Sequence, residues 1–235
     1  MAQAAANDNL SGRYNSAMTS RRRGMLIAFA IVVAFLAAFV LTPPRGTRSM
    51  RQFNAERLAR LETRMWQAYY AKQNARLFGL LVTMLHEQYH YSWARAATEA
   101  FHLARAAATF GNMKHGDGVR YEVVLPDLEK AYAAAKSWTG AAFDPREVAR
   151  AELAWWVARR IPGQNSAEQV GRLIAEEYGL LYETSPMAVA DAAFLRAQAA
   201  ALRDAQAKSP DWDRIAALLL QSYRELSTAL ATASV

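Results

Sequence analysis

The feature that most constrains this chain is an unbroken apolar run, GMLIAFAIVVAFLAAFVL, which extends from Gly24 to Leu41. It follows three consecutive arginines, and no charged residue occurs in the 21 residues from Gly24 to Pro44. At a rise of about 1.5 Å per residue, a helix of this length reaches across a hydrocarbon core of about 30 Å. Because no water inside a bilayer satisfies backbone N–H and C=O groups, a crossing segment has to be helical. We therefore predict a single transmembrane helix.

The sequence on either side of this run sets the predicted domain boundaries. Residues 1–20 are small and polar without a period, which is typical of a disordered tail. The apolar run is longer than the roughly 7–15 residues of a cleaved signal peptide, and no small-x-small site precedes Pro43-Pro44. We interpret residues 21–44 as an uncleaved signal-anchor with a basic flank, and residues 45–235 as one all-helical domain.

The net charge of +7 lies on the flanks of the apolar run. Residues 1–64 hold ten arginines and three acidic residues, whereas residues 65–235 hold 18 basic and 18 acidic residues. Basic flanks attract anionic lipid headgroups, whereas a nucleic-acid-binding protein carries its basic excess on the folded domain. We expect the lipid bilayer as a partner and no binding of nucleic acid.

The two basic flanks are almost balanced as topology signals. Arg21 to Arg23 directly abut the apolar run, whereas the later arginines, from Arg45 to Arg60, are spaced out and diluted by Glu56. The positive-inside rule thus favours a cytoplasmic N-terminus. We predict a single-pass protein of the bacterial inner (plasma) membrane with its domain in the periplasm. The chain has no cysteine, which excludes disulfides, cysteine-ligated metals and thiol catalysis without deciding the compartment.

Residues 47–231 carry helical patterns and helix-capping signals throughout. Asn74 and Ser92 are predicted to cap helices, and Ser166 with Gln169 forms a capping-box pattern. The predicted helical segments are 47–71, 75–91, 93–110, 126–138, 145–160, 167–183, 186–207 and 210–231. No window alternates apolar and polar residues with β-branched enrichment, so no sheet is predicted. The predicted fold class is all-α: a transmembrane helix followed by one extramembrane domain. We predict six to seven helices in this domain, which is fewer than the eight helical segments given above.

Three prolines strengthen the placement of the later helices. Pro145, Pro186 and Pro210 each follow an Asp or a Ser. A proline lacks the N–H that would be unsatisfied at the first helical position, and the preceding polar side chain caps the helix. We therefore expect each of these prolines in a first helical turn.

One short motif carries recognisable chemistry. His86-Glu87-Gln88-Tyr89-His90 resembles the HExxH signature of zincin metalloproteases, in which the two histidines bind zinc and the glutamate activates water. If the chain reverses tightly at Ser92, Glu99 lies beside His86 as a third ligand, with His102 one turn further along. The metal-ligand candidates are His86, His90, Glu87 and Glu99, while the sheet of the known zincin families is absent from the predicted fold.

A second interpretation of the same motif is that it forms part of a di-iron site. Glu87-x-x-His90 matches half of the site in a ferritin-like four-helix bundle. Glu62, Glu152 and Glu176 or Glu177 offer carboxylates from other helices, but no second Glu-x-x-His follows because Gly179 or Leu180 stands where its histidine would be.

The remaining signal is an excess of aromatic residues, which fill a core or anchor a partner surface. Neighbours on a helix point about 100° apart, so the Trp155-Trp156 pair predicts either a helix that is buried on two sides or one Trp that contacts a partner or the membrane interface. Ala30, Ala34 and Ala38 form a small-residue stripe that permits self-association in lipid.

We predict a membrane-anchored, non-catalytic helical scaffold or membrane-complex subunit without a cofactor, which binds a protein partner or forms a homo-oligomer. The alternative is a membrane-tethered metalloenzyme, with zinc or iron held by His86, Glu87 and His90.

Overall fold

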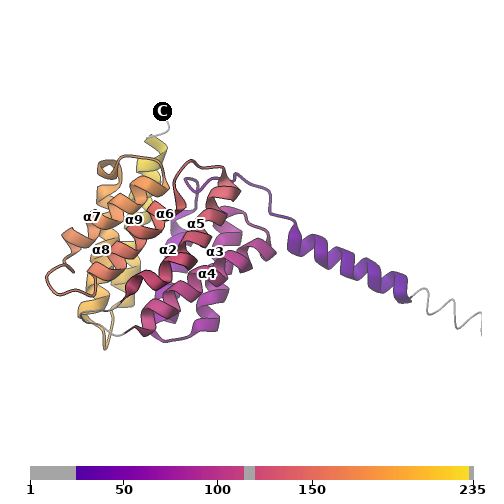
Figure 1. Ribbon diagram of the computed structural model, residues 1–235, viewed down its shortest axis with the longest axis horizontal. Helices are drawn as coiled ribbons and strands as arrows, with labels where there is room; N and C mark the ends of the chain where they lie inside the picture. Colours follow the sequence, from indigo (N-terminus) through magenta and orange to yellow (C-terminus); the bar gives the residue numbers. More distant parts are fainter. Residues whose placement is uncertain (1–24, 114–119, 233–235) are drawn as a thin grey trace, which may run out of the picture. The chain divides into compact units, whose positions relative to one another are not determined.

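The computed structural model describes residues 25–113 and 120–232. The predicted disordered tail, residues 1–20, and the arginines of the basic flank before the apolar run lie outside the described residues. The chain divides into two compact units, Met1–Thr42 and Pro43–Val235. The described part of the first unit is one helix over residues 25–41 (Figure 1). All of its side chains are exposed.

A search of the described residues for a helix both long and apolar enough to cross a membrane finds none.

The second unit is built from eight α-helices and two short 3₁₀ helices, and no strand occurs among the described residues. In chain order these are α2 (Ala55–Tyr70), α3 (Asn74–Tyr89), α4 (Trp93–Asn112), η1 (Tyr121–Val124), α5 (Leu125–Thr139), α6 (Pro145–Ala158), α7 (Ala167–Leu181), η2 (Pro186–Val189), α8 (Ala190–Ala205) and α9 (Trp212–Thr232). The all-α prediction is confirmed. The count of six to seven helices is wrong, because the interruptions are long enough to keep all eight segments separate.

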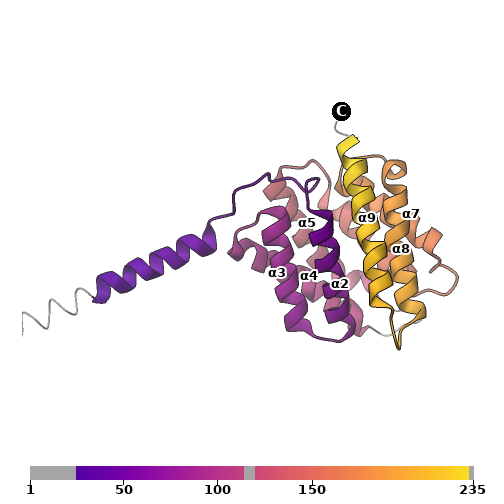
Figure 2. The ribbon, with the colours of Figure 1, turned by 180° about the vertical axis from the view of Figure 1, so that it is seen from behind.

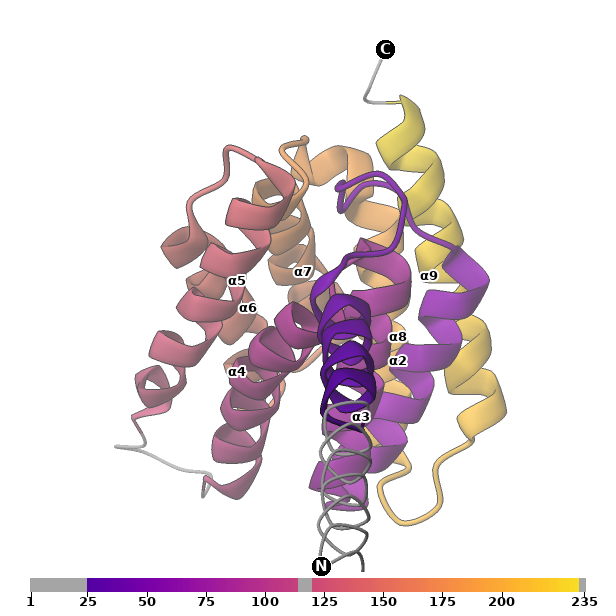
Figure 3. The same cartoon turned by 90° about the vertical axis from the view of Figure 1, so that its right-hand side faces the viewer.

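The eight helices form a closed ring. From α2 to α9, consecutive α-helices pack against each other, and α9 packs back against α2. Figure 2 shows α9 beside α8, and Figure 3 shows α2 next to α9 with α5 and α6 on the other side of the domain. Among the described residues no other pair of α-helices is in extensive contact. The ring therefore consists of one layer of helices around a central lumen.

Neighbouring helices run in opposite directions, which gives the ring two distinct ends. At one end, Lys72 after α2 donates to the Gly111 carbonyl of α4 (3.1 Å), and Arg160 after α6 donates to the Phe110 carbonyl (2.8 Å). We call this the open end; α2, α4, α6 and α8 finish there. At the other end, the Trp138 indole of α5 donates to the Tyr89 carbonyl of α3 (2.8 Å). We call this the strap end.

The strap end is covered by residues 43–54, which we call the strap. The His90 ring nitrogen donates to the Thr47 carbonyl (3.1 Å), and the Arg48 guanidinium lies 4.1 Å from the centre of the Trp138 ring. Gly46 approaches His90 so closely that a Cβ there would lie 2.3 Å from Nε2. The strap corrects the sequence prediction that a helix begins at residue 47, because α2 begins only at Ala55.

Several predicted caps are confirmed and others are corrected. Ser92 and Ser166 each accept a backbone N–H in the first turn of the following helix. Asn74, however, is the first residue of α3 and not its cap. Asn54, which the prediction left inside a helix, caps α2 by accepting from the Arg57 N–H (2.7 Å).

The prolines follow the same mixed pattern. Pro145 begins α6 as predicted, after an Asp144 cap. Pro186 begins the 3₁₀ helix η2, and α8 starts four residues later. Pro210 lies outside α9, because Asp211 caps this helix by accepting from the Arg214 N–H (3.0 Å).

Candidate functional site

The centre of the ring holds a cavity of about 560 Å³, to which all eight α-helices contribute lining residues. We call this cavity the lumen. Its wall is largely apolar and aromatic, with Trp66, Tyr132, Trp155 and Tyr178 facing it from four different helices. The aromatic excess seen in the sequence therefore faces a cavity as well as a core. Trp155 is 5% exposed and Trp156 packs against the core, so the helix that carries them is buried on two sides as predicted.

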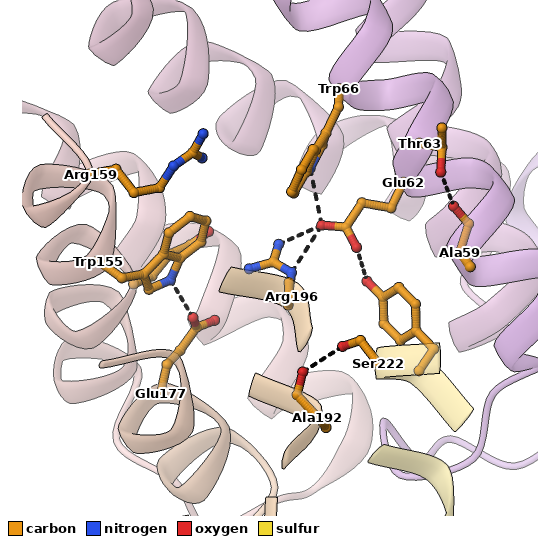
Figure 4. A network of polar contacts seen from close by, with 12 residues as sticks. Ala59, Glu62, Thr63, Trp66, Trp155, Arg159, Glu177, Ala192, Arg196 and Ser222 are labelled. Atoms are coloured by element: carbon orange, nitrogen blue, oxygen red, sulfur yellow. Dashed lines mark hydrogen bonds and ion pairs between the residues drawn. The ribbon is translucent and has the colours of Figure 1, made fainter. Parts of the chain in front are cut away.

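Glu62 on α2 organises the polar contacts of the lumen wall. Its Oε1 accepts from Arg196 Nε (3.1 Å) and Nη2 (2.5 Å) and from Trp66 Nε1 (3.1 Å), while Oε2 accepts from the Tyr223 hydroxyl. Figure 4 shows Arg196 and Trp66 converging on Glu62. Glu62 is 4% exposed, so this carboxylate pairs with Arg196 inside the protein. The network ties α2 to α8 and α9, where the ring closes.

Two further carboxyl groups of the lumen wall, on α6 and α7, are hydrogen-bonded to the same tyrosine on α5. The Tyr132 hydroxyl lies 2.8 Å from Glu152 Oε2 and 3.3 Å from Glu177 Oε1. Glu177 also accepts from Trp155 Nε1 at 2.5 Å (Figure 4). Burial, with the neighbouring Glu177 charge, raises the pKa of Glu152 to about 8, and burial raises the pKa of Glu177. This pair therefore retains a proton near neutral pH.

Glu99 on α4 is the fourth carboxyl group of the lumen wall. It is 4% exposed, and its Oε2 has no hydrogen-bond partner. Burial raises the pKa of Glu99 to about 8, against the opposing effects of the Tyr91 hydroxyl and the Arg95 charge. At neutral pH Glu99 is thus mainly a neutral acid with hydrogen-bonding capacity left over. We refer to Glu62, Glu99, Glu152 and Glu177 as the inner carboxyls.

The open end of the lumen is rich in arginine. Arg159 Nη2 donates to the Tyr70 hydroxyl (2.8 Å) and to Asp204 Oδ2 (2.8 Å). Arg203 lies over the Tyr70 ring, and Arg160 lies over Phe110 at 3.6 Å from its centre. The lining reaches the surface here, since the neighbouring Lys72 and Asp204 are exposed.

The structure separates the members of the HExxH motif. The helix ends at Tyr89, and His90 follows in a left-handed conformation (φ 56°, ψ 31°), so the prediction that the whole motif lies on one helix is wrong. His86 Nδ1 bonds to the Tyr91 carbonyl (2.7 Å), and its ring stacks on Trp93 at 3.7 Å. Glu87 forms a two-point ion pair with Arg57, at 2.6 and 2.9 Å.

The other candidate ligands also have separate neighbours. Glu99 faces the lumen, and His102 Nδ1 bonds to Asp127 Oδ1 (3.0 Å). Glu62, Glu152 and Glu177 do line one cavity, as the di-iron reading requires, whereas Glu176 is exposed. Within residues 25–113 and 120–232, however, no three His, Asp or Glu side chains gather so as to hold a metal ion.

Sequence reasoning missed the arginines of the lumen. Arg159, Arg160, Arg196 and Arg203 lie in segments that read as ordinary helix surface, where an arginine is expected to be solvated. Nothing in their local sequence distinguishes them from the exposed Arg150 or Arg172. The only usable signal concerns Arg159 and Arg160, which closely follow the Trp155-Trp156 pair. That pair indicates that both sides of α6 are covered.

No protein-family model, curated protein or solved structure matches the chain.

Proposed function

We propose that this chain is a membrane-anchored, non-catalytic binding protein whose helical ring holds a small organic ligand in the lumen. The observation that carries the proposal is the cavity of about 560 Å³ lined by every helix of the ring, with the unpartnered carboxyl oxygen of Glu99 in its wall. A close-packed helical core has few voids larger than a water molecule. A cavity of this size at the centre of a domain is therefore better explained by an occupant than by loose packing.

The chemistry of the wall fits a ligand site. Pockets for small molecules measure about 300–1,000 Å³ and combine an apolar, aromatic lining with a few placed polar groups. Here Trp66, Trp155 and Tyr178 offer ring surfaces, and the inner carboxyls offer hydrogen-bond donors and acceptors. Glu62 is occupied by its own network, whereas Glu99 keeps one oxygen for a ligand.

The proposed anchor is the helix that contains residues 25–41. Its 17 described residues are uncharged and exposed, and its large apolar side chains range from 39% exposed at Val40 to 78% at Phe35. They span about 26 Å at the helical rise, and a helix that is apolar on all sides needs an apolar environment. The basic residues on both flanks suit anionic headgroups. The proposed location is the bacterial inner membrane with the domain in the periplasm, and a protein partner or homo-oligomer stays a prediction.

The test fills the lumen and measures binding of a neutral aromatic probe. Ala131 on α5 lines the lumen, whereas Ala133 two residues later is exposed. Ala131→Phe places a phenyl ring in the cavity, and Ala133→Phe is the matched control on the same helix. Isothermal titration calorimetry of full-length protein in detergent, with naphthalene-2-sulfonamide as probe and empty micelles as blank, measures affinity.

The expected result is binding of one probe per chain, at least tenfold weaker in Ala131→Phe and unchanged in Ala133→Phe. Ala107→Phe on α4, which fills the lumen from another helix, guards against a local folding defect at position 131. Circular dichroism confirms that each variant keeps its helices. Equal probe binding by the lumen variants and by Ala133→Phe, or no binding by the native protein, would refute the proposed function.

A further inference from the structure

The open end of the lumen carries a surplus of positive charge that the described residues do not neutralise. Four cationic side chains line it, Lys72, Arg159, Arg160 and Arg203, together with a single carboxylate, Asp204. Asp204 accepts from Arg159 at 2.8 Å and from Arg203 at 3.3 Å. One carboxylate is thus shared by two guanidinium groups, and neither Arg160 nor Lys72 has an acidic partner among the described residues.

Two of these arginines retain unused donors in buried positions. Arg160 Nη1 and Arg203 Nε are both inaccessible to solvent and have no hydrogen-bond partner in the part of the chain that the structure describes. Both side chains are held in place, Arg160 by the Phe110 carbonyl and ring, and Arg203 by the Tyr70 ring. A buried donor without an acceptor destabilises the folded state, and more so when it is charged. The guanidinium groups are therefore preorganised for an acceptor that none of the described residues provides.

The inner carboxyls do not supply the missing negative charge. Glu62 pairs with Arg196, and burial keeps Glu99 and Glu152 mainly protonated at neutral pH, with pKa values of about 8. Even when Glu177 is ionised, the five basic side chains that line the lumen outnumber its three remaining carboxylates, Glu62, Glu177 and Asp204, so the lumen as a whole is electropositive. This distribution of charge disfavours an amine or another organic cation as the ligand, even though five carboxyl groups, the inner carboxyls and Asp204, line the cavity.

We infer that the open end is an anion-binding site, in which Arg160 and Arg203 hold the acidic group of an organic acid whose apolar or aromatic body occupies the lumen. The inference rests on the proposed function and specifies its ligand class. A planar guanidinium binds the oxygens of a carboxylate, sulfonate or phosphate through parallel, charge-assisted hydrogen bonds. The rings of Tyr70 and Phe110 restrict the two guanidinium groups, so binding an anion loses little side-chain freedom.

The test compares two probes of nearly the same shape and different charge. Naphthalene-2-sulfonate is an anion, and naphthalene-2-sulfonamide is its neutral counterpart. Calorimetry on the full-length protein should show at least tenfold tighter binding of the sulfonate. Arg160→Gln and Arg203→Gln should each reduce this preference by about tenfold, which corresponds to the loss of one charge-assisted hydrogen bond. Arg150→Gln, at an exposed position on α6, the helix that Arg160 follows, is the matched control and should leave the preference unchanged.

The outcomes separate the two proposals. If the sulfonamide binds in the lumen and the sulfonate binds no more tightly, the anion site is refuted and the proposed function stands. If neither probe binds, both are refuted. An anion preference that survives Arg160→Gln and Arg203→Gln would place the charge selectivity elsewhere and overturn the assignment. Sodium sulfate is titrated as a third probe; affinity equal to that of the sulfonate would show an inorganic anion site and refute the organic acid.

Discussion

Replacement of Glu62 by leucine should destabilise the domain more than any change at a surface ion pair. Glu62 and Arg196 form a buried pair, with side chains 5% and 14% exposed, joined by bonds of 3.1 and 2.5 Å. Glu62→Leu leaves the Arg196 charge without this partner. It also removes the acceptor of the Trp66 indole and of the Tyr223 hydroxyl.

The expected cost follows from the fate of Arg196. Breaking a buried ion pair by removing one partner costs about 3–5 kcal/mol. Glu177 lies near enough for the Arg196 charge to lower its pKa, so it can ionise and take over part of the pairing. The cost should therefore fall at the lower end, about 3 kcal/mol. For a domain of this size, 1 kcal/mol shifts Tm by about 2–4 °C, which predicts a loss of about 6–12 °C.

The assay is thermal unfolding of the full-length protein followed by circular dichroism. Glu56 is the control, because it also joins α2 to α9 through a two-point contact with Arg224, at 3.0 and 2.9 Å, but on the exposed surface. Glu56→Leu should hardly change Tm, since exposed pairs contribute little. The double variant Glu62→Leu with Arg196→Met should recover most of the loss, because no uncompensated charge remains. Equal losses at the two glutamates, or no recovery in the double variant, would refute the reasoning.

Three further predictions concern other parts of the chain. Gly46→Ala should lower Tm, because the new Cβ would lie 2.3 Å from the His90 ring. Gly79→Ala should raise the stability by about 1 kcal/mol, because Gly79 lies in the middle of a helix and a Cβ there meets nothing within 4 Å. Equal shifts of Tm in thermal melts of the two variants would contradict this prediction. Since burial raises the pKa of Glu99 from 4.5 to about 8, the folded state keeps a proton that the unfolded state releases. Stability should therefore fall between about pH 5 and 8 by about 1.4 kcal/mol per unit, and Glu99→Gln should reduce this slope in denaturant titrations; an unchanged slope would exclude Glu99 as its source. The helix containing residues 25–41 should keep the protein in membranes through carbonate washing, and release by carbonate would disprove the anchor.

The helical character of the domain was predictable because its determinants are local. Capping residues such as Ser92 and Ser166 and the proline at 145 act within one turn of the backbone, and they mark helix starts correctly. The prediction failed where tertiary contacts decide. The strap before α2 has a helical sequence pattern, but contacts with His90 and Trp138 at the end of the ring hold it in another conformation.

The candidate site was predictable only in fragments. Glu62, Glu152 and Glu177 were recognised as carboxylates that could meet, and they do line one cavity. The closure of α9 on α2 is a contact between segments far apart in the sequence, and no local pattern encodes it. Without that closure, the lumen and the inward direction of Arg160 and Arg203 could not be inferred. The prediction from the HExxH motif failed for a local reason. His90 itself has a left-handed conformation, so it lies beyond the end of the helix that carries His86 and Glu87.

The most direct test of a ligand-binding lumen is the position of a heavy atom in a crystal. Crystals of the protein grown with 6-bromonaphthalene-2-sulfonate would locate bromine through its anomalous scattering, independently of any side-chain interpretation. We predict one bromine site per chain inside the ring, among Trp66, Trp155 and Tyr178, with the sulfonate toward Arg160 and Arg203. Bromine found only on the outer surface of the helices, with the lumen free of the probe, would contradict it.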